Sequence, residues 1–178
     1  MRLERLEATQ RPEKLKAVFD GETLTVSASL CVQFSLCAGM ELDEEAFSAL
    51  KAAVAKEAAR ERAVRILTAS AVSERELEKR LLQKGTLPAD AADAVAWLKE
   101  HRFLDDAATA AQLVDSAVRK GYGRARVKNI LYEKGIPKDL WDEALARIPA
   151  MDDAIDRFLA AKLRGRTADE KTIKKTID

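Results

Sequence analysis

The sequence predicts a mainly α protein: tandem three-helix units in an elongated curved array, with a small N-terminal β-hairpin. The composition favours helices, because hydrophobic residues make up 47% of the 178 positions whereas aromatic residues make up only 5% and charged residues 34%. A repeated phrase indicates units: RLLQKGTLPADAADAV, which begins at Arg80, returns fifty positions later as ILYEKGIPKDLWDEAL, which begins at Ile130. Because a unit of roughly 50 residues buries only a marginal core, we expect neighbouring units to lean on each other.

Residues 1–42 are expected to form the N-terminal β-hairpin segment. Within 15–27, the pair Asp20-Gly21 suits a two-residue hairpin turn. The β-type apolar positions of the two strands are Val18, Leu24 and Val26. The following stretch, ASLCVQFSLCAGM, fits either a further strand or a short helix.

Residues 43–103 hold a linker helix and the first three-helix unit. Asp43 can cap a helix over 44–69, which contains no Gly or Pro and which the sequence allows as one rod or as two pieces. The apolar residues of this helix at near-helical spacing are Phe47, Leu50, Val54, Ala58, Val64 and Leu67.

Capping signals define the next two helices of the first unit. Ser73 and Glu76 form a capping box, Gly85 suits a left-handed C-cap, and Pro88 suits the first turn of the helix that follows. The residues expected on the inner faces are Leu77, Leu81, Val95 and Leu98.

Residues 104–150 repeat this pattern as a second three-helix unit. Asp105 or Asp106 caps the first helix, Gly121 ends it, and a second helix is expected over 124–134 before Pro137 opens the third. The inner residues are Leu113, Val114, Ala117, Val118, Val127, Leu131, Leu140, Trp141, Leu145 and Ile148. Residues 151–178 begin a third unit, which is expected to be incomplete.

Charge and cysteine usage narrow the class of protein. The net charge of +1 gives no global basic field of the kind that marks a nucleic-acid binder. Cys31 and Cys37 lack both the spacing of a zinc site and the fuller framework of a secreted protein, so we expect reduced, buried thiols and a cytoplasmic location. No apolar stretch resembles a signal peptide or approaches the roughly 20 residues of a membrane span. We expect a monomer.

The sequence predicts no enzyme, no metal site and no cofactor. Neighbouring acids on a helix point about 100° apart, so helix capping explains Asp105-Asp106 and Asp152-Asp153 better than ion binding does. His101 is the only histidine and suits a solvent-facing helix end, because no motif supplies it with a Cys or Ser partner.

A run of positive charge over 119–138 is the clearest binding signal, with seven basic residues and one acid, Glu133. Helical spacing places Arg124 and Lys128 on one side. Such a patch suits phosphates or the acidic surface of a protein, and it also suits a plain solvated helix face. The candidate partner-binding residues are Arg119, Lys120, Tyr122, Arg124, Arg126, Lys128 and Lys134.

Tyr122 lies between two glycines on an expected turn. An aromatic ring at such a place suits a pocket of a partner or a stacked base, and it equally suits the cover of its own three-helix core.

The stretch FLDDAATAAQLVDSAVRKGYGRARVKNILYEKGIP resembles the RecX family, which regulates the bacterial RecA recombinase. The matching elements are Leu104-Asp105-Asp106, Arg119-Lys120-Gly121-Tyr122-Gly123, Leu131 and Lys134-Gly135-Ile136. Upstream, SERELEKRLLQKG resembles the phrase of the family's first repeat, and the hairpin with GMELDEE resembles its longer members. Thr109 departs from the family pattern, which carries an aromatic residue there, and we expect looser packing in the middle unit.

The resemblance implies a protein that binds along the groove of the RecA-type recombinase filament on DNA. It further implies inhibition of strand exchange and of ATP hydrolysis by the recombinase, and promotion of filament disassembly. Contact with DNA inside the filament stays open. A DNA-binding helical repeat protein that acts without a protein partner is the alternative, and a general protein-interaction scaffold is a third.

Overall fold

The computed structural model describes residues 1–149, which fall into two compact units. Unit 1 spans Met1–Leu104, and unit 2 begins at Asp105. Each unit is described by itself. The expected third three-helix copy, over 151–178, lies outside the described residues.

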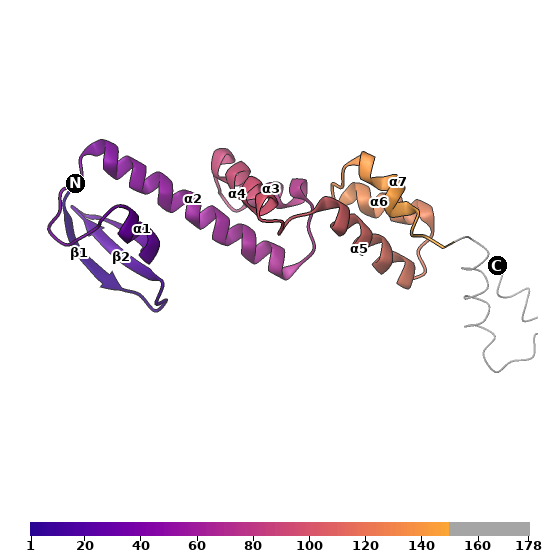
Figure 1. Ribbon diagram of the computed structural model, residues 1–178, viewed down its shortest axis with the longest axis horizontal. Coiled ribbons are helices and arrows are strands. Elements are labelled where there is room, and N and C mark those ends of the chain that lie inside the picture. The colour runs from indigo at the N-terminus through magenta and orange to yellow at the C-terminus, as the bar shows by residue number, and fades with distance from the viewer. Residues whose placement is uncertain (150–178) are drawn as a thin grey trace, which may run out of the picture. The chain divides into compact units, whose positions relative to one another are not determined.

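Unit 1 opens with a three-stranded antiparallel sheet, drawn in indigo in Figure 1, whose strand order is β1-β2-β3. The strands are β1 (Leu3–Ala8), β2 (Lys14–Phe19) and β3 (Glu22–Ser27). The predicted hairpin of β2 and β3 is confirmed, since Phe19 pairs with Glu22 across the two-residue turn. Gly21 has a φ of +89°, the left-handed conformation that this turn requires and that glycine adopts without strain.

Strand β1 was not predicted from the sequence. Its apolar residues Leu3 and Leu6 are three positions apart, which is a helical rather than a strand spacing. A shift of the β1–β2 register between Leu3 and Arg5 explains this spacing, because one extra residue in a strand brings both leucines to the same face. Leu3 is fully buried in the core under the sheet, and Leu6 packs against that core.

Two helices follow the sheet. The stretch that fitted either a strand or a helix forms α1 (Ala28–Gln33), capped by the hydroxyl of Ser27. Helix α2 (Glu44–Ala69) is one continuous rod of 26 residues, and the Asp43 carboxylate accepts a hydrogen bond of 2.7 Å from the backbone N–H of Ala46. The predicted cap is therefore confirmed.

Helix α2 belongs to two hydrophobic cores. Figure 1 shows the sheet beside its first half and helices α3 and α4 beside its second half. Phe47 and Leu50 pack with the sheet, whereas Ala59, Ala63 and Ile66 pack with the three-helix core. Ala58 and Val64, which fall near the helical spacing of the other apolar residues, are both exposed. The small side chains at 59 and 63 occupy the face against which α4 packs.

The two helices that complete unit 1 are α3 (Glu74–Gln83) and α4 (Pro88–Glu100). The Ser73 hydroxyl accepts a hydrogen bond from the backbone N–H of Glu76, as the capping box predicts, and Pro88 lies in the first turn of α4. Leu77, Leu81 and Leu98 are buried as predicted.

Unit 2 repeats the three-helix arrangement of α2, α3 and α4. Its elements are α5 (Asp106–Arg119), α6 (Arg124–Glu133), a short 3₁₀ turn η1 (Lys138–Leu140) and α7 (Trp141–Leu145). The Asp105 carboxylate accepts hydrogen bonds from the backbone N–H groups of Ala107 and Ala108, so the predicted cap is confirmed. The fully or nearly fully buried residues of the core include Val114, Val127, Leu131 and Leu145. Thr109 is buried on α5, and looser packing at that position stays a prediction.

The two cysteines behave differently from each other. Cys31 is half-buried and packs against the core under the sheet, and burial raises the pKa of its thiol. Cys37 is exposed, so the prediction that it packs as a buried residue is wrong. Leu36, its neighbour in the loop after α1, is the residue that enters the core. Over residues 1–149, none of the helices combines the length and apolar character that a membrane crossing needs.

Candidate interaction surface

The predicted partner-binding residues lie at the end of α5, in the turn that follows it, and along α6. Arg119 ends α5, Lys120 caps it, Tyr122 lies in the turn, and Lys134 caps α6 at its C-terminus. The remaining three basic residues lie on α6 itself: Arg124, Arg126 and Lys128. All of these side chains are exposed except that of Lys134, which is half-buried and already interacts with another group of the protein.

Helix α6 divides its basic residues between two sides. Arg124 and Lys128 are four residues apart and share one side, as predicted. Arg126 points elsewhere, and its guanidinium carbon lies 5.9 Å from the centre of the Tyr122 ring, which is a cation–π contact. The structure therefore brings Tyr122 together with Arg126, a pairing that the sequence did not indicate.

Tyr132 is a surface residue that sequence reasoning missed. It follows Lys128 by four positions, so Arg124, Lys128 and Tyr132 continue along one side of α6, and the Tyr132 side chain is 71% exposed. The helical spacing from Arg124 was the signal that could have found it. We call Tyr122, Arg124, Arg126, Lys128 and Tyr132 the α6 basic surface.

One residue of the α6 basic surface also has a structural contact. The Arg124 guanidinium donates a hydrogen bond of 3.4 Å to the backbone carbonyl of Leu145, at the C-terminus of α7. A cation at a helix C-terminus is favourable because the last carbonyl groups carry partial negative charge. A substitution of Arg124 therefore removes a contact between α6 and α7 as well as a surface charge, whereas Arg126 and Lys128 have no such contact with the described residues.

The start of α6 departs from the usual chemistry of a helix N-terminus. Gly123 supplies no side-chain cap, the first turn holds no acid, and Arg124 and Arg126 lie there instead. A helix N-terminus carries partial positive charge, so basic residues in its first turn are unfavourable, by about 0.3–1 kcal/mol each on exposed surfaces.

The equivalent helix of unit 1 has the opposite charges. Fifty positions upstream of Gly123, Arg124, Arg126 and Lys128, helix α3 and its cap hold Ser73, Glu74, Glu76 and Glu78. The Ser73 hydroxyl caps α3, and Glu74 and Glu76 lie in its first turn, where negative charge is favourable. The same fold thus accepts a well-capped acidic start, and helix-dipole and capping effects do not explain the basic start of α6.

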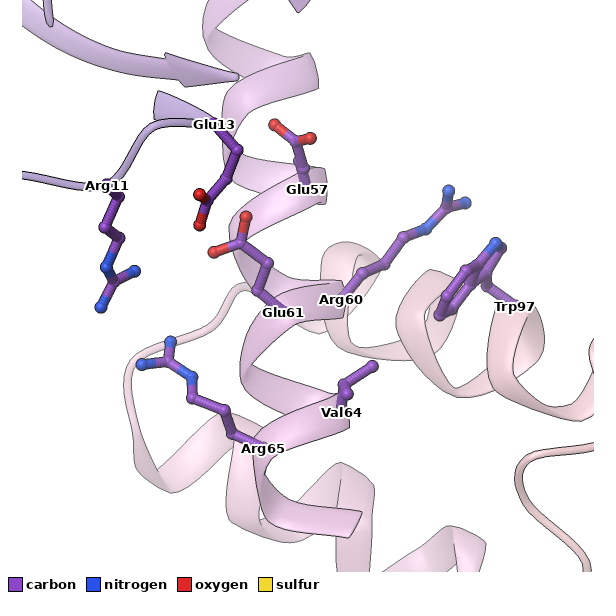
Figure 2. A pocket seen from close by; sticks show the side chains of 8 residues that line it. All are labelled: Arg11, Glu13, Glu57, Arg60, Glu61, Val64, Arg65 and Trp97. Carbon is purple, nitrogen blue, oxygen red and sulfur yellow. The ribbon is translucent and has the colours of Figure 1, made fainter. Parts of the chain in front are cut away.

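A pocket of about 600 Å³ in unit 1 is the other candidate site (Figure 2). It lies between α2, Trp97 of α4 and the turn that joins β1 to β2, and it mixes both signs of charge. Two of its acids, Glu57 and Glu61, form ion pairs with the largely buried Lys14 of β2. Burial alone would lower the pKa of Lys14, but these two carboxylates outweigh burial and raise it. The pocket acids thus join the sheet to α2.

Within residues 1–149, no three or more His, Cys, Asp or Glu side chains are grouped so that they could hold a metal ion. His101 caps the C-terminus of α4 and is exposed, as predicted for a solvent-facing helix end.

Tandem three-helix domains, one of which presents a basic helix face, define a helical-repeat protein. Two family models match the chain in order: the first three-helix domain of RecX over residues 59–98, and the second three-helix domain of RecX over residues 105–145. The chain belongs to the RecX family.

Individual proteins similar to this chain carry the same family name. The chain is 36% identical over 96 residues to the regulatory protein RecX of Cronobacter sakazakii, a match that covers 48% of this chain and 58% of that protein. The regulatory protein RecX of Shigella dysenteriae is 37% identical over 95 residues, covering 48% and 57% respectively. The chain thus spans a little over half the length of these curated relatives. A crystal structure of a regulatory protein RecX matches with a TM-score of 0.72 and 23% identity, over 98% of this chain and 89% of that one, which shows the fold.

Proposed function

We propose that this protein regulates a RecA-type recombinase by docking on the recombinase filament on DNA, and that the α6 basic surface supplies one of the contacts. The start of α6 is the observation that carries this proposal. Two arginines stand in a first turn that disfavours them, and their guanidinium groups gain most from a partner that presents carboxylates or phosphates. Membership of the RecX family supports the recombinase as that partner.

The direction of the proposed regulation is inhibition of ATP hydrolysis and of strand exchange. The protein acts by binding rather than by catalysis, and it works inside the cell on the filament. Tyr122 and Tyr132 flank the basic side chains with exposed rings, and aromatic residues beside arginines are typical of residues that dominate a protein interface.

The experiment is a titration of this protein into a recombinase that hydrolyses ATP on single-stranded DNA. The wild-type protein is expected to lower the hydrolysis rate at concentrations that leave the same DNA unbound when no recombinase is present. Unchanged hydrolysis at saturating protein would refute the proposal.

Charge reversal tests the surface. The Arg126→Glu/Lys128→Glu variant is expected to need at least about tenfold more protein for half-inhibition, because like charges would then face each other across the contact. The matched control is Arg75→Glu/Lys79→Glu on α3, which makes the same change in net charge on two exposed residues of the equivalent helix. Equal inhibition by the α6 variant and the wild type would exclude the α6 basic surface.

A second candidate function is DNA binding without a protein partner, which the three basic residues and two exposed tyrosines of the α6 basic surface favour. It requires tight binding to bare DNA, with an affinity that falls steeply as salt rises. Tight DNA binding together with unchanged ATP hydrolysis would favour this second function over the first.

A further inference from the structure

The turn that ends α4 differs from the turns that end α3, α5 and α6, and it shares a non-glycine residue of positive φ only with the turn after α1, where Ser35 has a φ of +50°, among the helix ends of residues 1–149. Helices α3, α5 and α6 end in Gly85, Gly121 and Gly135, which all have positive φ. Helix α4 reaches the same conformation with a non-glycine residue, Arg102, whose φ is +58°. The backbone N–H groups of Arg102 and Phe103 bond back to the carbonyls of Lys99 and Leu98, each at 2.9 Å, which completes the usual helix-ending motif.

An arginine in this position strains the backbone. The Cβ atom of an L-residue crowds the carbonyl oxygen in the left-handed region, and glycine avoids that crowding. Strained residues of this kind cluster at functional sites, where the side chain contributes to binding or catalysis. No hydrogen bond or ion pair with any residue in 1–149 occupies the Arg102 guanidinium, so its use is not found within the described fold.

Phe103, the next residue, is also unusual for its place in the motif. The residues that follow Gly85 and Gly135 are Thr86 and Ile136, and both are buried. Phe103 occupies the corresponding place after Arg102, yet its side chain is 61% exposed. The α4 turn therefore displays a phenyl ring next in sequence to a guanidinium group, whereas the turns at Gly85 and Gly135 bury the following residue and the turn at Gly121 is followed by the exposed Tyr122.

The exposed ring is held in place by an aromatic cluster. The centre of the Phe103 ring lies 6.4 Å from the centres of both the His101 and the Trp97 rings, and the His101 ring is parallel to it within 2°. The ring centres of His101 and Trp97 are 4.7 Å apart, and the guanidinium carbon of Arg60 lies 5.3 Å from the centre of the Trp97 ring. Figure 2 shows Arg60 and Trp97 in the lining of the same pocket. A ring held this way loses little conformational entropy on binding.

Charged residues of both signs surround the cluster. Lys99 pairs with Glu74 at 2.8 Å, and Asp93 accepts from Lys56 and Arg60, while Glu100 adds an exposed acid close to Arg102. An apolar centre with a rim of both charges is typical of a protein–protein contact, whereas a nucleic-acid backbone needs a predominantly basic surface.

We propose that Arg102 and Phe103 form a second docking element, in which Phe103 inserts into an apolar pocket of the protein partner and Arg102 pairs with a carboxylate beside that pocket. This proposal rests on the proposed function, since the partner is the recombinase filament. It gives the two units different chemistry: unit 1 contributes an aromatic anchor, and unit 2 contributes the α6 basic surface.

Two variants of the full chain test the docking element in the ATP-hydrolysis assay. Arg102→Gly is expected to raise the melting temperature by about 2–4 °C, because it relieves the strain, and yet to raise the half-inhibitory concentration at least fivefold. Phe103→Ala is expected to raise that concentration at least tenfold with little change in melting temperature, because the lost ring is mostly exposed. The matched control is Leu87→Ala, which removes an equally exposed apolar side chain, 66% exposed, at the other end of α4.

The discriminating result is that Arg102→Gly is more stable than the wild type and yet inhibits ATP hydrolysis less strongly. Full inhibition by both Arg102→Gly and Phe103→Ala, alongside an inhibiting wild type, would overturn the docking element and leave the proposed function intact. A wild type that does not inhibit would overturn both. If circular dichroism shows that Phe103→Ala is misfolded, its loss of inhibition is uninformative and Phe103→Leu takes its place. Inhibition at the wild-type level by a folded Phe103→Leu would overturn the need for an aromatic anchor. If Phe103→Ala also bound bare single-stranded DNA more weakly than the wild type does, the proposal that Phe103 inserts into a pocket of a protein would be overturned.

Discussion

The uncapped start of α6 predicts that Gly123→Ser stabilises unit 2. Gly123 has a φ of −74° and a ψ of 167°, and Ser73, the cap of α3, has −77° and 165°, so the two backbones are nearly the same. A Cβ atom added at Gly123 would meet nothing within 4 Å. The added hydroxyl can therefore accept a hydrogen bond from the backbone N–H of Arg126, as Ser73 does from that of Glu76 at 3.1 Å.

The expected gain is a few tenths to about 1 kcal/mol, from the cap and from the lower conformational entropy of the unfolded chain. That gain corresponds to a rise of about 1–4 °C in melting temperature for a chain of this size. The assay is urea unfolding followed by the emission of Trp141, which lies in unit 2, in a Trp97→Phe background that removes the only tryptophan of unit 1.

Gly123→Ala separates the two sources of the gain. Alanine also restricts the unfolded chain but is a poor N-cap, so the serine variant should exceed the alanine variant by about 1 kcal/mol. Equal stability of the two variants would show that no cap forms. A loss of stability in Gly123→Ser would refute the equivalence of the two helix starts.

Two further predictions concern unit 2. Leu131→Ala removes a fully buried side chain and should cost about 2–5 kcal/mol of the free energy of unfolding, whereas Tyr132→Ala, next to it and exposed, should change it by less than about 0.5 kcal/mol; similar costs for both would contradict the described core. The guanidinium of Arg147 donates hydrogen bonds of 2.9 and 2.7 Å to the Asp115 carboxylate and lowers the pKa of that carboxyl below its usual value of 3.8. Because the pKa is lowered in the folded state, the stabilisation is present above pH 3.8 and is lost as pH falls through the folded pKa. An NMR titration of the Asp115 carboxyl should give a midpoint below 3.8 that returns toward that value in Arg147→Gln, and a midpoint that Arg147→Gln leaves unmoved would contradict the ion pair.

Helix ends were predictable because the residues that make them act locally. The hydroxyl of Ser73 and the carboxylates of Asp43 and Asp105 bond to backbone groups two or three residues away, so their sequence spacing contains the geometry. The glycines at 85 and 135 likewise take the left-handed conformation that ends a helix.

Features that depend on distant partners were not predictable in this way. Strand β1 exists because β2 pairs with it, and a register shift hides its pattern. The inner face of α2 changes along its length because the helix leaves one core for another, which no single period describes. The α6 basic surface was only partly predicted, since the exposure of Tyr132 and the contact between Arg124 and Leu145 both depend on how α6 and α7 pack.

Helix α2 also has a consequence for protease resistance. Its 26 residues extend about 39 Å, and its two halves are held by different sets of partners. A protease must unwind several residues to cut a helix, and unwinding the middle of α2 would pull Leu50 from the sheet core and Ala59 from the three-helix core. We therefore expect proteases to spare the boundary between those cores and to cut unit 1 in its exposed loops instead.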